Sequence, residues 1–103
     1  MKEEYSLRYL PLFAEDLQAA KEYISNNLHN PEAAQNLVSK VEGAILKRLS
    51  APESFEPFQS TRKRKNPYYR IYVNNYCVFY VVIDAVMEVR RFIYVGRNVD
   101  EIL

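Results

Sequence analysis

The chain has 103 residues, a formal net charge of +1 and a hydrophobic content of 49%, which together predict one domain, residues 1–103, with an adequate core. Two glycines and five prolines exclude a low-complexity chain, and the single cysteine excludes an internal disulfide. No apolar run is long enough to span a bilayer, and no apolar signal segment follows Met1, so we expect a soluble cytoplasmic protein.

The positive charge is concentrated in the second half of the chain. Residues 1–53 contain six Lys and Arg against eight Asp and Glu, whereas residues 54–103 contain eight against five. The halves therefore carry −2 and +3, a smaller asymmetry than a strong nucleic-acid-binding protein shows.

A strand and a helix are predicted at the start of the chain. Apolar and polar side chains alternate over residues 4–10, which is the period of a strand, and Pro11 ends the pattern. Over residues 12–28 the apolar residues recur every three or four positions, as on one face of a helix. The residues predicted to form this buried stripe are Phe13, Leu17, Ala20, Ile24 and Leu28.

A second helix is predicted from Pro31 to about Leu49. Asn30 is a favourable N-cap, and proline suits the first helical position because its missing N–H would have no partner there. The short connection makes the two helices an antiparallel hairpin. The predicted buried stripe of the second helix contains Ala34, Leu37, Val38, Val41, Ile45 and Leu49.

A long loop is predicted for residues 50–67, which contain three of the five prolines. It also contains the densest basic run of the chain, Arg62, Lys63, Arg64 and Lys65. Such a run either binds phosphates or an acidic partner, or is an ordinary solvated loop.

A β-hairpin is predicted from residues 68–73 and 76–83, joined by a two-residue turn at Asn74-Asn75. The second of these strands is apolar on both faces, which favours a central position in the sheet. A tight turn pairs Val73 with Tyr76, Ile71 with Val78, and Tyr69 with Tyr80.

Alternation gives this hairpin two different faces. The first is expected to pack on the helices, and the second is expected to be less covered because it bears a charge and a phenol. A final strand from about Met87 to Val95 adds either Arg90 or Arg91 to the second face, depending on the turn at Asp84-Ala85. The first face contains Tyr69, Ile71, Val73, Tyr76, Val78, Tyr80 and Val82, and the second contains Arg70, Tyr72, Cys77, Phe79 and Val81.

The order strand, helix, helix, strand, strand, strand predicts an α+β fold. We expect an N-terminal strand, an antiparallel helical hairpin and then a three-stranded antiparallel meander. Together the strands would form one small, mainly antiparallel sheet with the helices on one face.

Several segments carry a family resemblance over nearly the whole chain. They are the opening strand with its proline, Asn30-Pro-Glu-Ala-Ala34, Tyr69-Arg-Ile-Tyr-Val73, Tyr76-Cys-Val-Phe-Tyr80 with Asp84, and Ile93-Tyr-Val-Gly-Arg-Asn98. In this order and spacing they resemble the RelE/ParE superfamily of toxins from type II toxin–antitoxin modules, also called plasmid stabilisation proteins.

The resemblance implies a growth inhibitor that a cognate antitoxin neutralises, either as a homodimer or within a toxin–antitoxin hetero-oligomer. ParE-like members poison DNA gyrase, which is the function we expect here. RelE-like mRNA interferases instead cut mRNA in the ribosome, using basic residues on the open face of the sheet. An inactive relative that only binds an antitoxin is a third alternative.

The RelE-like alternative assigns roles to individual residues. Arg70 matches the first basic strand residue of that group, whereas Tyr72 and Cys77 stand where a lysine and an arginine are expected. Asn98 stands where a further arginine is expected, with Arg97 beside it. An enzyme of this kind would be a metal-independent endoribonuclease, with Arg70 and Arg97 stabilising phosphate charge and Tyr72 transferring protons.

The other candidate residues would contact nucleic acid or a protein partner, and each also has an ordinary interpretation as a solvated side chain. Cys77 is expected to be a small buried residue, and His29 is too isolated to form a metal site or a catalytic triad. No cofactor, metal ion or membrane contact is expected. The contact candidates are Arg62, Lys63, Arg64, Lys65, Arg90, Arg91 and Asn98.

Overall fold

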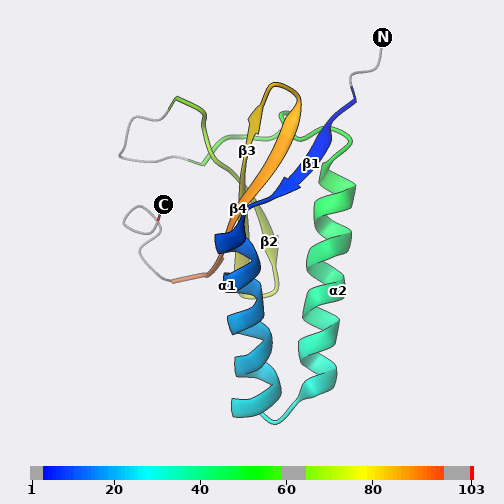
Figure 1. The fold of residues 1–103 in the computed structure, drawn as a ribbon, viewed down its shortest axis with the longest axis vertical. Coiled ribbons are helices and arrows are strands. Elements are labelled where there is room, and N and C mark those ends of the chain that lie inside the picture. The colour runs from blue at the N-terminus through cyan, green and yellow to red at the C-terminus, as the bar shows by residue number, and fades with distance from the viewer. Residues whose placement is uncertain (1–3, 59–64, 97–102) are drawn as a thin grey trace.

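The fold is α+β, as predicted, and combines a helical hairpin with a four-stranded sheet (Figure 1). The computed structural model describes residues 4–58, 65–96 and 103. Within these ranges no helix is long and apolar enough to cross a membrane. The elements are β1 (Ser6–Tyr9), α1 (Pro11–Glu22), the π-helical turn η1 (Tyr23–Asn27), α2 (Pro31–Arg48), β2 (Tyr69–Val73), β3 (Tyr76–Ile83) and β4 (Val86–Tyr94).

The strands lie in the order β1-β4-β3-β2. β1 runs parallel to β4, whereas β2, β3 and β4 form the predicted antiparallel meander. β3 therefore has a neighbour on each side, which agrees with its apolar residues on both faces. Both helices contribute to one core with this sheet, so the layered arrangement expected from the sequence is confirmed.

Both helices begin at a proline, whose missing N–H removes a donor that would have no partner in the first turn. Asn30 caps α2 as predicted, because its side-chain oxygen accepts a hydrogen bond from the backbone N–H of Ala33 at 3.0 Å. α2 then runs back beside α1 as the second arm of the hairpin (Figure 1).

The first helix departs from the prediction in its last turn. α1 ends at Glu22 and continues as η1, after which the N–H of Leu28 bonds to the carbonyl of Tyr23 at 3.2 Å. This wider turn moves the following residues out of the α-helical period, so Leu28 is 57% exposed instead of buried. Phe13 and Ala20 are buried as expected.

The β2–β3 hairpin has the predicted register around its two-residue turn. Asn74 adopts a φ of 54°, a left-handed conformation that this kind of turn requires and that asparagine tolerates. The observed pairs include Val73 with Tyr76, Ile71 with Val78, and Tyr69 with Tyr80.

The β3–β4 turn also contains two residues. Asp84 and Ala85 have φ values of 49° and 62°, so β4 begins at Val86, directly opposite Ile83. A left-handed alanine is unfavourable by roughly 1–2 kcal/mol, which the pairing of the two strands must offset.

A β-bulge in β4 decides where its two arginines lie. Phe79 pairs with Arg91, but the next residue of β3, Tyr80, pairs with Val89, which leaves Arg90 as the extra residue. Simple alternation along β4 therefore fails at this point, and both arginines, where only one was expected, lie on the face of Phe79, opposite the helices.

Each face of the sheet has its own core. On the helix-facing side, Val41, Ile45 and Tyr80 are fully buried, which confirms the predicted packing face. The opposite side, which we call the outer face, carries β2 residues Arg70 and Tyr72 together with a smaller buried cluster. That cluster consists of Tyr68, Cys77, Phe79, Val81 and Ile93, with Phe58, Ile83 and Leu103 packed against it.

Candidate functional site

The outer face is the less covered one, as expected, but it is partly closed. Phe58, in the loop after α2, and Tyr68, just before β2, both lie edge-on to the ring of Phe79, at centroid distances of 5.5 and 6.4 Å. The N–H of Phe58 donates to the carbonyl of Tyr68 at 2.6 Å, which ties the two ends of the loop together. Cys77 and Val81 are buried in the cluster that these rings cover.

Arg70 and Tyr72 stay open on this face. Tyr72 is 61% exposed and Arg70 is also exposed. The guanidinium carbon of Arg70 lies 5.3 Å from the centroid of the Tyr72 ring and 5.2 Å from that of Phe58. Arginine and aromatic residues are enriched at protein interfaces, so this group of one cation and two aromatic rings is suited to contact another protein.

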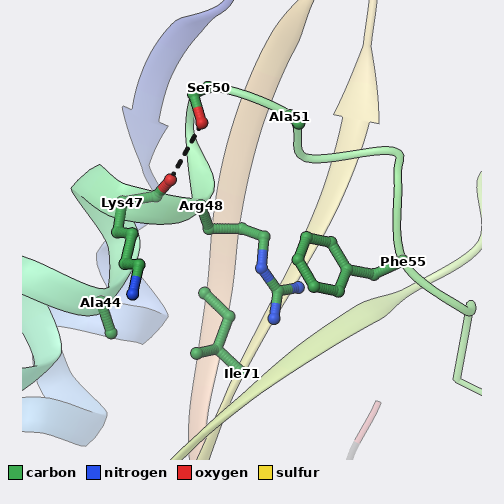
Figure 2. Close-up of a pocket in the computed structure, with 7 residues that line it drawn as sticks. All are labelled: Ala44, Lys47, Arg48, Ser50, Ala51, Phe55 and Ile71. Carbon is green, nitrogen blue, oxygen red and sulfur yellow. Dashed lines mark hydrogen bonds between the residues drawn. The ribbon is translucent and has the colours of Figure 1, made fainter.

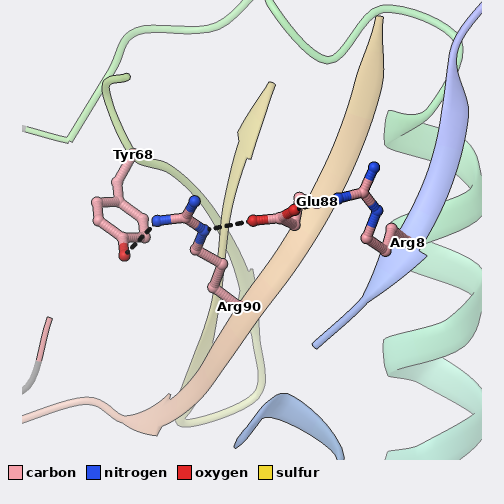
Figure 3. Close-up of polar contacts among 4 residues, drawn as sticks. All are labelled: Arg8, Tyr68, Glu88 and Arg90. Atoms are coloured by element: carbon pink, nitrogen blue, oxygen red, sulfur yellow. Dashed lines mark hydrogen bonds and ion pairs between the residues drawn. The ribbon is translucent and has the colours of Figure 1, made fainter. Parts of the chain in front are cut away.

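Arg90 lies on the outer face, inside an ion-pair network around the buried carboxylate of Glu88 (Figure 3). Its Nε donates to Glu88 Oε1 at 2.8 Å, and Arg8 Nη1 donates to the other carboxylate oxygen at 2.9 Å. Arg90 Nη1 also donates to the Tyr68 hydroxyl at 3.4 Å. Partial burial favours a lower pKa for Arg90, but the hydrogen bonds with Tyr68 and Glu88 outweigh it and raise that pKa. The network therefore holds a charged arginine in place.

Arg91 is attached to α1. Its Nε and Nη2 donate to the two carboxylate oxygens of Asp16 at 2.7 and 3.0 Å, and the N–H of Phe92 donates to the same carboxylate at 3.0 Å. The hydrogen bond with Asp16 raises the pKa of Arg91 despite the opposing effect of burial. This bidentate pair fastens the helix to the edge of β4.

Several predicted site residues lie outside the described residues: Arg62, Lys63, Arg64, Arg97 and Asn98. The grouping of Arg97 with Arg70 and Tyr72 stays a prediction. Lys65, the last residue of the basic run, is described and exposed.

The thiol of Cys77 is buried, as the sequence predicted. Burial raises its pKa, and the positive charge of Arg70 offsets this only in part. A raised pKa keeps the thiol protonated, which is the opposite of what a nucleophile needs. His29 is exposed in the turn before α2, as its isolated position suggested.

Arg48 is a functional candidate that the sequence did not reveal. Its Nη1 donates to the buried hydroxyl of Tyr80 at 2.9 Å and to the carbonyl of Arg70 at 3.3 Å. Its guanidinium carbon lies 3.5 Å from the centroid of the Phe55 ring. Only the basic pair that Arg48 forms with Lys47 at the end of the predicted helix could have drawn attention to it.

Arg48 lines a cavity of about 460 Å³ beside β2, which we call the β2 recess (Figure 2). The last turns of α2, the loop that follows and one strand residue form its walls. The lining residues are Ala44, Lys47, Arg48, Ser50, Ala51, Phe55 and Ile71.

A second concave surface, which we call the interhelical groove, lies between α1 and α2. It consists of two adjoining cavities of about 280 and 350 Å³, which share Tyr9, Phe13 and Leu17. Tyr9 stacks on Phe13 at a centroid distance of 5.5 Å and is 45% exposed. Partial burial, and then the charge of Glu42, raise the pKa of Tyr9. The other lining residues are Ala14, Gln18, Lys21, Val38, Val41, Glu42, Ile45 and Leu46.

Comparison with known proteins gives a family and a set of related folds. The profile of the family described as "ParE toxin of type II toxin-antitoxin system, parDE" matches residues 7–99. No curated protein matches the sequence.

Three solved structures resemble the fold. The chromosomal ParDE TA system from P. aeruginosa has a TM-score of 0.69 and 17% identity, covering 89% of this chain and 97% of that one. The E. coli DinJ–YafQ toxin–antitoxin complex gives 0.58 and 10%, covering 89% and 93%. The archaeal RelE–RelB complex from Pyrococcus horikoshii OT3 gives 0.53 and 18%, covering 92% and 99%. At these identities the likeness is one of fold.

Proposed function

This chain belongs to the ParE toxin family of type II toxin–antitoxin systems, and from this premise we propose that it stops growth by binding a protein target, DNA gyrase. In this proposal the protein is not a nuclease, and a cognate antitoxin neutralises it.

The observation that supports binding over cleavage is the pairing of the outer-face arginines. Cleavage of RNA without a metal ion needs cations that are available to stabilise charge developing on the phosphate. Arg90 is paired with Glu88, Arg91 is paired with Asp16, and Cys77 occupies a further position that is cationic in RelE-like nucleases. Of the strand arginines in the described ranges, this leaves Arg70 without an ion-pair partner.

A supercoiling assay tests the target. The purified protein is added to DNA gyrase and relaxed plasmid, and the products are separated by gel electrophoresis. We expect a loss of supercoiling that added antitoxin restores. Full supercoiling at a large molar excess of the protein would exclude gyrase.

The RelE-like alternative keeps one point in its favour, which is the exposed pair of Arg70 and Tyr72. Primer extension on cellular mRNA after induction tests it. New 5′ ends within codons, lost in a Tyr72→Phe variant, would support a nuclease and contradict our proposal.

We also propose that the antitoxin covers the interhelical groove. The groove has apolar walls with Lys21 and Glu42 among its polar residues, which suits an amphipathic helix laid along it. Leu46 is 60% exposed at this surface and is available for such a contact.

Co-purification with the product of the adjacent gene tests this site. Leu46→Asp would place a carboxylate in the apolar contact and should weaken the complex at least about tenfold. Leu12→Asp is the matched control, because Leu12 is 52% exposed but does not line the groove. Equal effects of the two substitutions would contradict the assignment of the groove.

A further inference from the structure

The β2 recess contains two cations with unused hydrogen-bonding capacity. Arg48 uses Nη1 for its bonds to Tyr80 and Arg70, whereas its Nε and Nη2 bond to no residue in the described parts of the chain. The ammonium of Lys47 likewise forms no ion pair or hydrogen bond there. Contact with Phe55 and Tyr80 fixes the Arg48 guanidinium, so a ligand would not have to order it.

Nearby carboxylates do not neutralise these cations within the described ranges. Glu53 lies near enough for its charge to help raise the pKa of Tyr80, and its Oε1 accepts a hydrogen bond from the Tyr5 hydroxyl at 3.2 Å. No carboxylate of the described residues forms an ion pair with Lys47 or Arg48. The recess is therefore positively charged between apolar walls.

The recess adjoins a free strand edge. β2 is last in the sheet order, so one of its edges has no neighbouring strand among the described residues. Val73 and Tyr76 flank the two-residue turn as a hydrogen-bonded pair, which directs the backbone groups of Arg70 and Tyr72 outward. Arg48 already donates to the Arg70 carbonyl, so the cation lies directly beside this edge.

We propose that the β2 edge and the β2 recess together bind an extended, acidic segment of a partner protein. The backbone of the segment would pair with the outward N–H and C=O of Tyr72. One aspartate or glutamate side chain would enter the recess, where the open side of the Arg48 guanidinium and the Lys47 ammonium bind its carboxylate. This surface uses a different side of α2 from the interhelical groove, and the proposal does not depend on gyrase being the target.

The chemistry of the walls favours a protein carboxylate over a phosphate. Lys47 and Arg48 lie in the last turn of α2, where the backbone carbonyls carry partial negative charge. A doubly charged phosphate is disfavoured beside these carbonyls more than a singly charged carboxylate. The apolar side chains of Ala44, Ala51 and Ile71 would contact the flanking residues of the segment.

An NMR titration of the purified full chain tests the proposal. The probe is a short synthetic peptide that alternates glutamate with valine, and the control peptide has glutamine in place of every glutamate. We expect amide shifts at Lys47, Ile71 and Tyr72, and binding of the glutamate peptide about tenfold tighter than binding of the glutamine peptide. Equal affinity for the two peptides, or shifts confined to the interhelical groove, would overturn the proposal.

Lys47→Glu tests the recess without disturbing the core, because Lys47 is exposed and has no structural partner in the described ranges, whereas Arg48 supports Tyr80. Its binding of the glutamate peptide should fall about tenfold or more. Lys21→Glu makes the same charge change on α1, away from the β2 edge and the β2 recess, and should bind within about twofold of the unmodified protein. An equal loss in both variants would show a general charge effect and overturn the proposal.

Discussion

The two faces of the sheet are held in different ways. The helix-facing side is closed by apolar residues of α1, α2 and the strands, which pack at the spacings of regular secondary structure. The outer face is covered by Phe58 and Tyr68 from a loop, and by Glu88 between two arginines. One side depends on buried apolar area, and the other depends on a few polar and aromatic contacts between distant segments.

This difference bears on function, because the RelE-like alternative would place RNA cleavage on the outer face. In this chain its arginines stabilise the fold: Arg90 holds Glu88 and Arg91 holds Asp16. The β2 recess and the interhelical groove, at the margins of the fold, are then the surfaces where we propose partner contacts.

The largest effect should come from the helix-facing core. Leu37 is 2% exposed, and Leu37→Ala should lower the free energy of unfolding by about 2–5 kcal/mol, because it removes buried area and leaves a cavity. Urea unfolding followed by circular dichroism measures this. Leu46→Ala, at a 60% exposed position of the same helix, should cost no more than about 0.5 kcal/mol. Similar losses in both variants would contradict the assignment of this face as the main core.

The outer face should respond next, through its ion pairs. The Glu88 side chain is 8% exposed, and Glu88→Gln should cost about 2 kcal/mol because it leaves Arg90 without its counter-charge. This is less than for a fully buried pair, since the side chains of Arg90 and Arg8 are 31% and 58% exposed.

Two arginine variants sharpen that comparison. Arg90→Ala should be more destabilising than Arg8→Ala in the same urea experiment, because Arg90 is the less exposed and also bonds to Tyr68. If Arg8→Ala lowered the free energy of unfolding as much as Arg90→Ala, the ion-pair network of Glu88 would not be centred on the covered part of the outer face.

The helix-facing side was predictable from sequence because its determinants are local. Alternation in β2 and β3 and the Asn74-Asn75 turn are enough to specify the hairpin register. The spacing of apolar residues in the two helices identifies most of the side chains that meet it, with Leu28 displaced by the π-helical turn.

The outer face was less predictable because its contacts join residues far apart in the chain. Arg8 bonds to Glu88 across 80 positions, and Arg91 bonds to Asp16 across 75. The bulge that places Arg91 on this face beside Arg90 leaves no sign in the residue types. Covering by Phe58 likewise depends on the path of a loop, which no periodicity specifies.

Tyr80 places a hydrogen-bonded hydroxyl inside the helix-facing core. Its hydroxyl donates to the Pro52 carbonyl at 2.7 Å and accepts from Arg48. Tyr80→Phe should therefore lower the free energy of unfolding by about 1–2 kcal/mol at neutral pH, because buried partners lose their hydrogen bonds.

The cost of Tyr80→Phe should also depend on pH. Burial raises the pKa of Tyr80 in the folded state, with Arg48 offsetting part of the rise. The stabilising contribution of a neutral Tyr80 is thus complete below the unfolded-state pKa of about 10 and declines as the pH rises through the folded-state pKa. Unfolding measured at neutral pH and above about pH 10 should show the gap between the two proteins narrowing. A gap that widens with pH would contradict the assigned burial.

A small change in stability, about 1 kcal/mol, is expected for Phe58→Ala, because Phe58 is only half-buried. Its effect on the outer face should nevertheless be plain, since the ring covers the cluster that contains Cys77. Uncovering this thiol lets its pKa fall towards the usual value, so reaction with a maleimide should become faster in native protein. Phe55→Ala is the matched control, because Phe55 lies in the same loop but packs on Arg48. If both variants expose Cys77 equally, loosening of the loop explains the result. If Phe58→Ala alone does, the Phe58 ring itself keeps the outer face closed, whereas the helix-facing side is closed by many apolar residues.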